Sequence, residues 1–183
     1  NIWNVSKLIG EHLNDYKVIV QKSTVPMGTA QKIKNVIQSN RWSNVEFDVV
    51  ANPEFLREGN AILDFLEGDR IVIGCDSWKG GEKLMQLYST LPSRIILTSP
   101  ESAEMIKYAS NAFLAMKISY INSIARICEK TGADIKEVAI GMGSDKRIGE
   151  DFLNAGLGYG GSCFRKDNRA LVHLSDELGF YFD

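Results

Sequence analysis

The sequence predicts an α/β fold, in which a parallel sheet is followed by an all-helical portion with one long helix. Up to residue 98, short runs rich in β-branched residues alternate with helical patterns, as in parallel strands joined by crossover helices. From Ser99 onward such runs stop, and apolar residues recur every three or four positions. We therefore expect a domain boundary between residues 98 and 99.

The first part is predicted to hold four strands and three helices. Pro26 and Gly28 break the chain after the first strand. The expected elements, in order, are a helix through Ile9, strand Lys17–Ser23, helix Thr29–Ile37, strand Val45–Asn52, strand Arg70–Asp76, a helix around Glu82–Tyr88 and strand Arg94–Thr98.

The long helix is predicted from Ser99 to about Gly132. Ser99 can cap it, Pro100 suits its first position, and Glu101 complements the helix dipole. Its circumference is apolar enough to need partners on several sides, so it is either the core helix of one domain or a subunit interface. The recurring apolar residues are Ile106, Ala109, Phe113, Met116, Tyr120, Ile124 and Ile127.

Two shorter helices are expected after it. Asp134 and Glu137 resemble a capping pair for a helix that ends at Gly141–Gly143. A glycine-rich stretch, NAGLGYGGSCF, then leads to a final helix, Lys166–Leu178.

Composition excludes several classes of function. The net charge of −2 gives no basic field, so nucleic acid is not an expected partner. No apolar run approaches the roughly 20 residues that span a bilayer, and the amino end lacks the features of a signal peptide. Three dispersed cysteines and two histidines show no metal-ligand spacing and fit a reducing cytoplasm. Because the chain begins without methionine, we interpret it as a fragment.

Gly156, Gly158 and Gly161 spell the G-x-G-x-x-G pattern of dinucleotide-binding loops. That loop must follow a buried strand, and the preceding RIGEDFLNA is too polar to be one. We reject it as a dinucleotide site and expect these glycines to mark backbone that passes close to a bulky group.

Cys163 is a candidate nucleophile. A lone cysteine is usually an inert core residue, and Cys75 at a strand end and Cys128 on the long helix fit that interpretation. Cys163 instead joins the glycine-rich stretch to a helix amino end, with Arg165 and Lys166 nearby. The helix dipole and these cations would favour the thiolate.

Lys107 and Asn111 lie four residues apart, and so on one face of the long helix. Such a pair is normally solvated. Because the neighbours here are apolar, a lysine that faces a cleft and stabilises an oxyanion is also plausible.

Polar residues also follow two predicted strands. Ser23 and Thr24 lie at the carboxyl end of the first predicted strand, and Glu54 and Glu58 follow the second. Open α/β sheets bind ligands at the carboxyl ends of their strands, so we expect these side chains to line a common crevice.

Five strings, in order, carry a resemblance to a known family. KSTVPMGT, NPEFLREGNAI, AEMIKYASNAFLA, DKRIG and GYGGSCFRKD resemble motifs of the UDP-glucose and GDP-mannose dehydrogenases, and DKRIG with GYGGSCF is closer to the UDP-glucose 6-dehydrogenase branch. The resemblance implies a partial NAD-binding, Rossmann-like domain over residues 1–98. It also implies a central helical domain over residues 99–183 that forms a homodimer through the long helix.

The resemblance implies oxidation of a nucleotide-sugar C6 alcohol to a carboxylate with NAD, through a cysteine thiohemiacetal and thioester, in polysaccharide biosynthesis. The implied catalytic residues are Cys163, Lys107, Asn111, Asp167, Glu54 and Thr24. Those implied on the NAD side are Ser23, Thr24, Glu58, Cys163 and Lys166. Those implied to bind the UDP-sugar are Glu54, Phe55, Leu56, Lys107, Asn111, Arg147, Phe152, Asn154 and Gly160.

Three alternatives accompany this prediction. The substrate could be GDP-mannose or UDP-N-acetylmannosamine. The chain could be a non-catalytic dimerisation module, since it lacks the first strand and glycine turn of an NAD domain, and we expect it to be inactive alone. A cysteine hydrolase is the third, but neither His12 nor His173 lies in a loop suited to activating a thiol.

Overall fold

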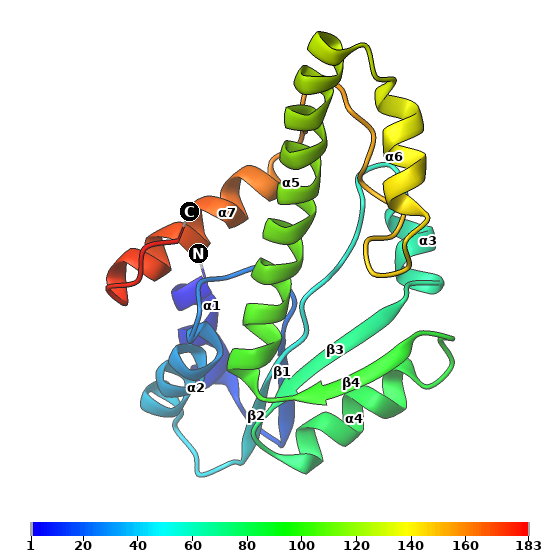
Figure 1. The fold of residues 1–183 in the computed structure, drawn as a ribbon. Coiled ribbons are helices and arrows are strands. Elements are labelled where there is room, and N and C mark those ends of the chain that lie inside the picture. The colour runs from blue at the N-terminus through cyan, green and yellow to red at the C-terminus, as the bar shows by residue number, and fades with distance from the viewer. Residues whose placement is uncertain (1, 183) are drawn as a thin grey trace. The chain divides into compact units, whose positions relative to one another are not determined.

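The computed structural model describes residues 2–182 and divides into two compact units, Asn1–Lys107 and Tyr108–Asp183. Figure 1 shows the order of the elements along the chain. In the first unit they are α1 (Ile2–His12), β1 (Lys17–Gln21), α2 (Thr29–Asn40), β2 (Phe47–Ala51), α3 (Ala61–Leu66), β3 (Arg70–Cys75), α4 (Trp78–Tyr88) and β4 (Arg94–Thr98). Helix α5 (Pro100–Thr131) continues into the second unit, which also holds α6 (Ile135–Gly143) and α7 (Cys163–Glu177).

The four strands form one sheet in the order β1-β2-β3-β4. Strands β1 and β2 are parallel, with Gln21 opposite Ala51, and β3 and β4 are parallel, with Gly74 opposite Thr98. The predicted α/β fold with one long helix is therefore confirmed.

The expectation of a wholly parallel sheet is wrong for one pair of strands. Strands β2 and β3 are antiparallel, with Val50 opposite Cys75 and Ala51 opposite Gly74. The connection between them holds only the six-residue α3, a helix that the sequence analysis did not predict. The chain therefore enters β3 from the end of the sheet at which β2 finishes.

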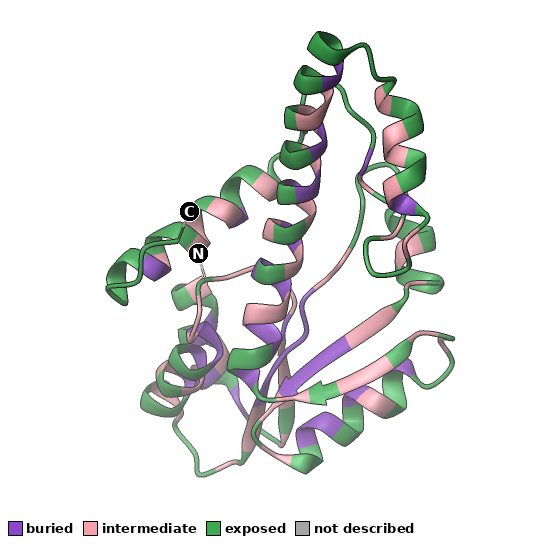
Figure 2. Ribbon diagram, in the orientation of Figure 1, coloured by how far each residue is buried: buried purple, intermediate pink, exposed green. Residues whose placement is uncertain are grey.

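The core of the first unit lies on both faces of the sheet. Val49, Ala51 and Val72 pack on one face with residues of α1, α2 and the start of α5, while Val50 and Ile73 pack on the other with α4. Successive residues of β2 therefore point to opposite faces, as strand geometry requires. In Figure 2 the buried residues concentrate along these strands.

A buried carboxylate caps α2 from a distant part of the chain. The N-cap residue of α2, Gly28, offers no side-chain acceptor. Glu104, 4% exposed on the first turns of α5, accepts hydrogen bonds from Gly28 N at 2.6 Å and Ala30 N at 2.9 Å. Burial raises the pKa of this carboxyl above its ordinary value, even though both hydrogen bonds act to lower it.

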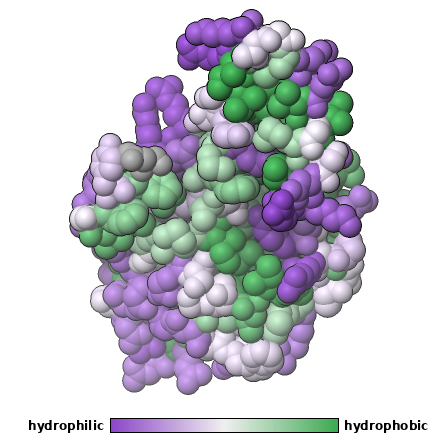
Figure 3. Space-filling model, viewed as in Figure 1, coloured by the Kyte–Doolittle hydropathy of each residue, from purple (hydrophilic) through white to green (hydrophobic). Residues whose placement is uncertain are grey.

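Helix α5 is buried along one side and exposed along another (Figure 2). Ser99 caps it as predicted, accepting from Ser102 N at 3.1 Å, and Asp134 caps α6 by accepting from Lys136 N at 2.7 Å. Figure 3 shows that hydrophobic residues also reach the surface of the molecule. Four of them on α5 are Phe113, Met116, Tyr120 and Ile127, each at least 50% exposed.

Within residues 2–182 we find no helix with the length and apolar character needed to cross a membrane.

Candidate active site

The carboxyl ends of β1 and β2 lie side by side because these strands are parallel and in register. A hydrogen bond of 2.9 Å from Asn52 N to Gln21 O extends the pairing one residue beyond the end of β2. The sheet thereby places Lys22, Ser23 and Thr24 beside the segment that begins at Asn52. This is the edge at which the sequence analysis predicted a crevice.

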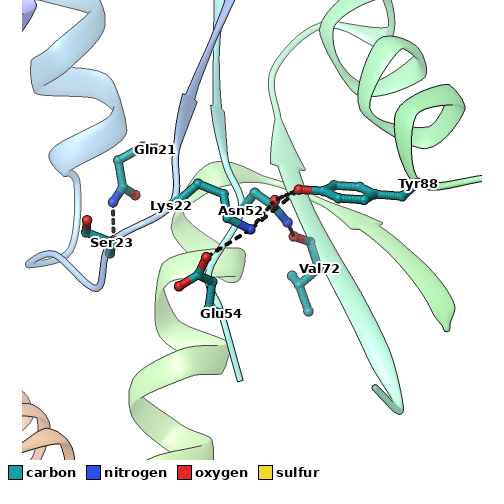
Figure 4. Close-up of polar contacts among 7 residues, drawn as sticks. All are labelled: Gln21, Lys22, Ser23, Asn52, Glu54, Val72 and Tyr88. Carbon is teal, nitrogen blue, oxygen red and sulfur yellow. Dashed lines mark hydrogen bonds and ion pairs between the residues drawn. The ribbon is translucent and has the colours of Figure 1, made fainter. Parts of the chain in front are cut away.

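A network of polar contacts centres on the ammonium of Lys22 at this edge (Figure 4). Its Nζ atom donates to Asn52 Oδ1 at 3.1 Å and to Tyr88 Oη at 3.4 Å. It also forms an ion pair with Glu54 Oε1 at 3.4 Å, and it lies 5.9 Å from the centroid of the Phe65 ring. The sequence analysis did not identify Lys22, because nothing in its surroundings distinguishes it from a solvated lysine.

Asn52 connects three strands. Its backbone N donates to the O atom of Gln21, the last residue of β1, and its side-chain Nδ2 donates to Val72 O in β3 at 2.7 Å. Its Oδ1 accepts from Tyr88 Oη at 2.7 Å as well as from Lys22. With 2% of its surface exposed, Asn52 satisfies polar groups at the point where β2 and β3 diverge.

Residues Phe55 to Glu58 follow Glu54 along the same segment. The Phe55 ring lies between two cations, with Arg70 Cζ 4.1 Å and Lys107 Nζ 5.3 Å from its centroid. Leu56 and Glu58 are exposed.

The pair predicted on α5 is buried: Lys107 is 8% exposed and Asn111 is 6% exposed. In the second unit, Asn111 Nδ2 donates to Asp167 Oδ2 at 2.7 Å. Asp167 is 1% exposed, and Lys166 Nζ lies 3.1 Å from its other carboxylate oxygen. The structure thus brings together Asn111, Asp167 and Lys166, whose common location could not be derived from their spacing.

Cys163 is the first residue of α7 and is exposed, whereas the sequence analysis began that helix at Lys166. Ser162 is its N-cap residue, and Ser162 O accepts a hydrogen bond from Lys166 N at 3.2 Å. The helix therefore starts three residues before the predicted start at Lys166. Cys128 is buried on α5. Cys75 ends β3, and burial raises the pKa of its thiol, as befits an inert cysteine.

Arg147 lies on a turn that a buried lysine holds. Its guanidinium is exposed and pairs with Asp145, with Nη2 2.5 Å from Oδ2, and this hydrogen bonding lowers the pKa of the Asp145 carboxyl. Lys117 on α5 is 9% exposed, and its Nζ donates to Ile148 O at 3.1 Å and Gly149 O at 3.3 Å. The buried ammonium caps the carbonyls at the end of the turn.

The glycine-rich stretch is a loop, and no strand precedes it between residues 144 and 162. Gly158 and Gly161 have φ of +116° and +79°, which other residues rarely adopt. Apart from the adjacent residues, no atom of the described chain lies within 4 Å of a Cβ placed on Gly156 or Gly158. The close approach to a bulky group that we expect at these glycines and at Gly161 stays a prediction.

The loop around the glycines is held from both ends. Gly156 N donates to Asn122 Oδ1 at 2.9 Å. The Phe164 ring on α7 lies 5.4 Å from the Tyr159 ring and 6.4 Å from the Phe152 ring. Asn154 and Gly160 are exposed between these contacts.

Comparison with known proteins identifies the family of the chain. Residues 1–92 match the NAD binding domain of the UDP-glucose/GDP-mannose dehydrogenase family, and residues 101–183 match its central domain. The chain is 54% identical over 177 residues to UDP-glucose 6-dehydrogenase TuaD of Bacillus subtilis, covering 97% of this chain and 38% of that protein. It is 46% identical to UDP-glucose 6-dehydrogenase of Pseudomonas aeruginosa, covering 96% of this chain and 40% of that protein.

Two solved structures share the fold. One is a UDP-glucose dehydrogenase from the archaeon Pyrobaculum islandicum, with a TM-score of 0.92 and 38% identity, over 98% of this chain and 42% of that one. The other is a ternary complex of GDP-mannose dehydrogenase from Pseudomonas aeruginosa, with a TM-score of 0.75 and 33% identity, over 97% of this chain and 43% of that one. The chain thus spans about two fifths of the length of these relatives. It belongs to the UDP-glucose/GDP-mannose dehydrogenase family, since its residues 1–92 and 101–183 match two domains of that family.

Proposed function

We propose that the protein carrying this chain oxidises the C6 alcohol of UDP-glucose to the carboxylate of UDP-glucuronate, using NAD. One observation supports it most: Cys163 is exposed at the start of α7, while Asp167, one turn later, is buried and held by Asn111. An accessible thiol beside a fixed carboxylate suits covalent catalysis on an aldehyde. UDP-glucose is favoured because relatives named for it are 46% to 54% identical to the chain.

The side chains at the edge of the sheet suit NAD. Ser23 and Thr24 offer hydroxyl groups directly after β1, and the exposed Glu58 offers a carboxylate that accepts from ribose hydroxyls. We assign these residues to NAD, together with Cys163 and Lys166. NAD, when bound, accepts one hydride in each of the two oxidations.

Cys163 is the nucleophile. The C6 alcohol first loses a proton and a hydride, which leaves an aldehyde. The Cys163 thiolate adds to the aldehyde carbon, and the resulting alkoxide takes up a proton to form a thiohemiacetal. Loss of that hydroxyl proton and of a second hydride from carbon gives a thioester.

The buried polar groups of α5 and α7 support these steps. Lys107 stabilises the negative oxygen that develops at C6, with Asn111 assisting. Asp167 and Thr24 hold a water molecule that takes the proton from the alcohol. Burial of Lys107 and Asp167 strengthens their electrostatic effect, because water screens them little.

Hydrolysis of the thioester is assigned to Glu54. Water attacks the carbonyl carbon, the carbon–sulfur bond breaks, and the Cys163 thiolate leaves. Glu54 takes one proton from the attacking water, and the second is released when the carboxylic acid ionises.

Residues in both units are assigned to the UDP-sugar. Arg147 on its exposed turn suits a phosphate or a hydroxyl-rich sugar. The remaining assigned residues lie on exposed or partly exposed segments, namely Phe55 and Leu56 after β2, and Phe152, Asn154 and Gly160 in the glycine-rich loop.

We further propose a homodimer through α5. Phe113, Met116, Tyr120 and Ile127 recur every three to seven residues along the helix and are exposed in the single chain. An exposed apolar stripe of this kind favours burial against a second copy. Analytical ultracentrifugation at micromolar concentration should show a dimer, and a monomer at every concentration would contradict this proposal.

Substitution of the cysteines tests the chemistry. In the full-length protein, Cys163→Ser should abolish formation of UDP-glucuronate, because an ester at this position hydrolyses far more slowly than a thioester. Cys75→Ser and Cys128→Ser are matched controls and should keep turnover. The same assay with GDP-mannose and UDP-N-acetylmannosamine distinguishes the substrates. Wild-type turnover by Cys163→Ser would refute the thioester mechanism.

A further inference from the structure

Glu54 is paired with a lysine at the carboxyl ends of β1 and β2. Its carboxylate is 42% exposed and forms an ion pair with Lys22 at 3.4 Å. An exposed pair of this kind usually contributes about 1 kcal/mol or less to stability, so stability alone does not account for it. What sets this pair apart is the way in which its lysine is held.

Lys22 is held from several directions. Its three N–H groups face three acceptors: Asn52 Oδ1, Tyr88 Oη and the Glu54 carboxylate. The rings of Phe65 and Tyr88 lie 5.9 Å and 5.7 Å from its ammonium, close enough for cation–π attraction. Figure 4 shows the lysine side chain extended toward Asn52 and Tyr88, with Glu54 beside it.

The groups that hold Lys22 are themselves fixed. Tyr88 is 8% exposed and Asn52 is 2% exposed, and they are joined by a hydrogen bond of 2.7 Å. Asn52 is bonded in turn to Val72 O in β3. A chain of contacts therefore runs from the centre of the sheet through Asn52 and Tyr88 to Lys22, and from Lys22 to Glu54.

We infer that Lys22 is a positioning residue, which orients the Glu54 carboxylate for attack of water on the thioester. This inference rests on the proposed function, in which Glu54 takes the proton of that water. Lys22 touches neither substrate nor water in this role. Without it, Glu54 turns freely in solvent, and a displacement of about 1 Å can cost about a hundredfold in rate.

The inference predicts a defect in one step only. In Lys22→Met of the full-length protein, both hydride transfers should proceed, and hydrolysis should slow by about a hundredfold. Mixing with NAD and UDP-glucose should then give a burst of NADH followed by slow turnover. Intact-mass spectrometry should detect the uronyl adduct, and peptide mapping should place it on Cys163.

Two further variants separate positioning from general damage. Lys34→Met removes a comparable ion pair, with Asp76 at 3.0 Å, and should leave both phases unchanged. Tyr88→Phe removes one hydroxyl from the network and should accumulate the same adduct to a smaller extent. It also serves as the test if Lys22→Met does not fold.

The outcomes are distinct. Turnover of Lys22→Met within twofold of wild type would overturn the inference. The inference also fails if folded Lys22→Met shows no adduct and its NADH burst slows as much as its steady-state turnover. If Lys22→Met does not fold, the absence of adduct from Tyr88→Phe overturns the inference instead. If the wild-type protein produces no NADH from UDP-glucose, the proposed function fails, and the role of Lys22 fails with it.

Discussion

Glu104→Ala should destabilise the first unit by about 2 to 4 kcal/mol. The substitution removes the acceptor for two backbone N–H groups at the start of α2, and Gly28 has no side chain to replace it. Each buried donor left without a partner costs about 1 to 3 kcal/mol. Relief from burying a charge offsets part of this cost, since burial raises the pKa of the carboxyl.

The same residue should make stability depend on pH in a defined direction. Because the folded state raises the pKa of Glu104 above its ordinary 4.5, the folded protein holds this proton more tightly than the unfolded chain does. Its contribution is therefore complete below pH 4.5 and declines as pH rises through the raised pKa. Glu104→Gln cannot titrate and should lack this decline.

Urea-induced unfolding followed by tryptophan fluorescence measures both effects. All three tryptophans, Trp3, Trp42 and Trp78, lie in the first unit, so the signal reports on the part of the chain that Glu104 supports. Each buried donor left unpaired should cost about 1 to 3 kcal/mol. If Glu104→Ala lowers the free energy of unfolding by less than about 0.5 kcal/mol on this scale, the capping of α2 by Glu104 is refuted. If the free energy of unfolding varies with pH in the same way for the wild type and Glu104→Gln, the raised pKa of Glu104 is refuted.

Three other substitutions test separate contacts. Asn111→Asp replaces an amide donor with a second carboxylate against the buried Asp167, so it should lower the stability at pH 7 by about 2 to 3 kcal/mol, which thermal melts of the variant and the wild type measure. Burial, with a hydrogen bond to Asp48, raises the pKa of Tyr16 above its ordinary 10.0. Absorbance at 295 nm should therefore show a tyrosine that titrates at unusually high pH, and Tyr16→Phe should lack this signal. The wild type should also lose more stability above pH 10 than Tyr16→Phe does. Lys117→Met frees two carbonyls and should raise hydrogen exchange at residues 145–149, whereas unchanged exchange there would contradict the capping role.

Much of the fold could be predicted because local signals were strong. Strand Arg94–Thr98 has the predicted bounds, and α5 differs from its predicted span by one residue at each end, since Ser99 and Gly132 mark these ends clearly. Helix α3 was missed because its apolar residues are largely exposed and show no buried face. The antiparallel pairing of β2 with β3 has no signal in the local sequence pattern.

The residues of the candidate site could be predicted where they belong to a sequence motif. They could not be predicted where the site depends on contacts between residues far apart in the sequence. The expected positions of Ser23, Thr24 and Glu54 at the strand ends follow from the alternation of strands and helices. Lys22 and Tyr88 lie 66 residues apart and meet only through the folded sheet. No sequence periodicity relates these two residues, so only the three-dimensional structure reveals their contact.

The boundary predicted between residues 98 and 99 stays a prediction. The family match to the central domain begins at residue 101, while the compact units divide after Lys107. Helix α5 begins at Pro100, after the predicted boundary, and runs through both residue 101 and Lys107. Limited proteolysis would locate the functional boundary.

The number of NADH molecules formed per UDP-glucose tests the central claim most directly. Two successive oxidations at C6, joined by the thioester on Cys163, require two NADH for each UDP-glucuronate, with no aldehyde released. We expect the full-length protein to give a ratio of two at complete conversion. A ratio of one, with UDP-sugar aldehyde in solution, would contradict the assignment of Cys163 and Glu54 to a second oxidation and its hydrolysis.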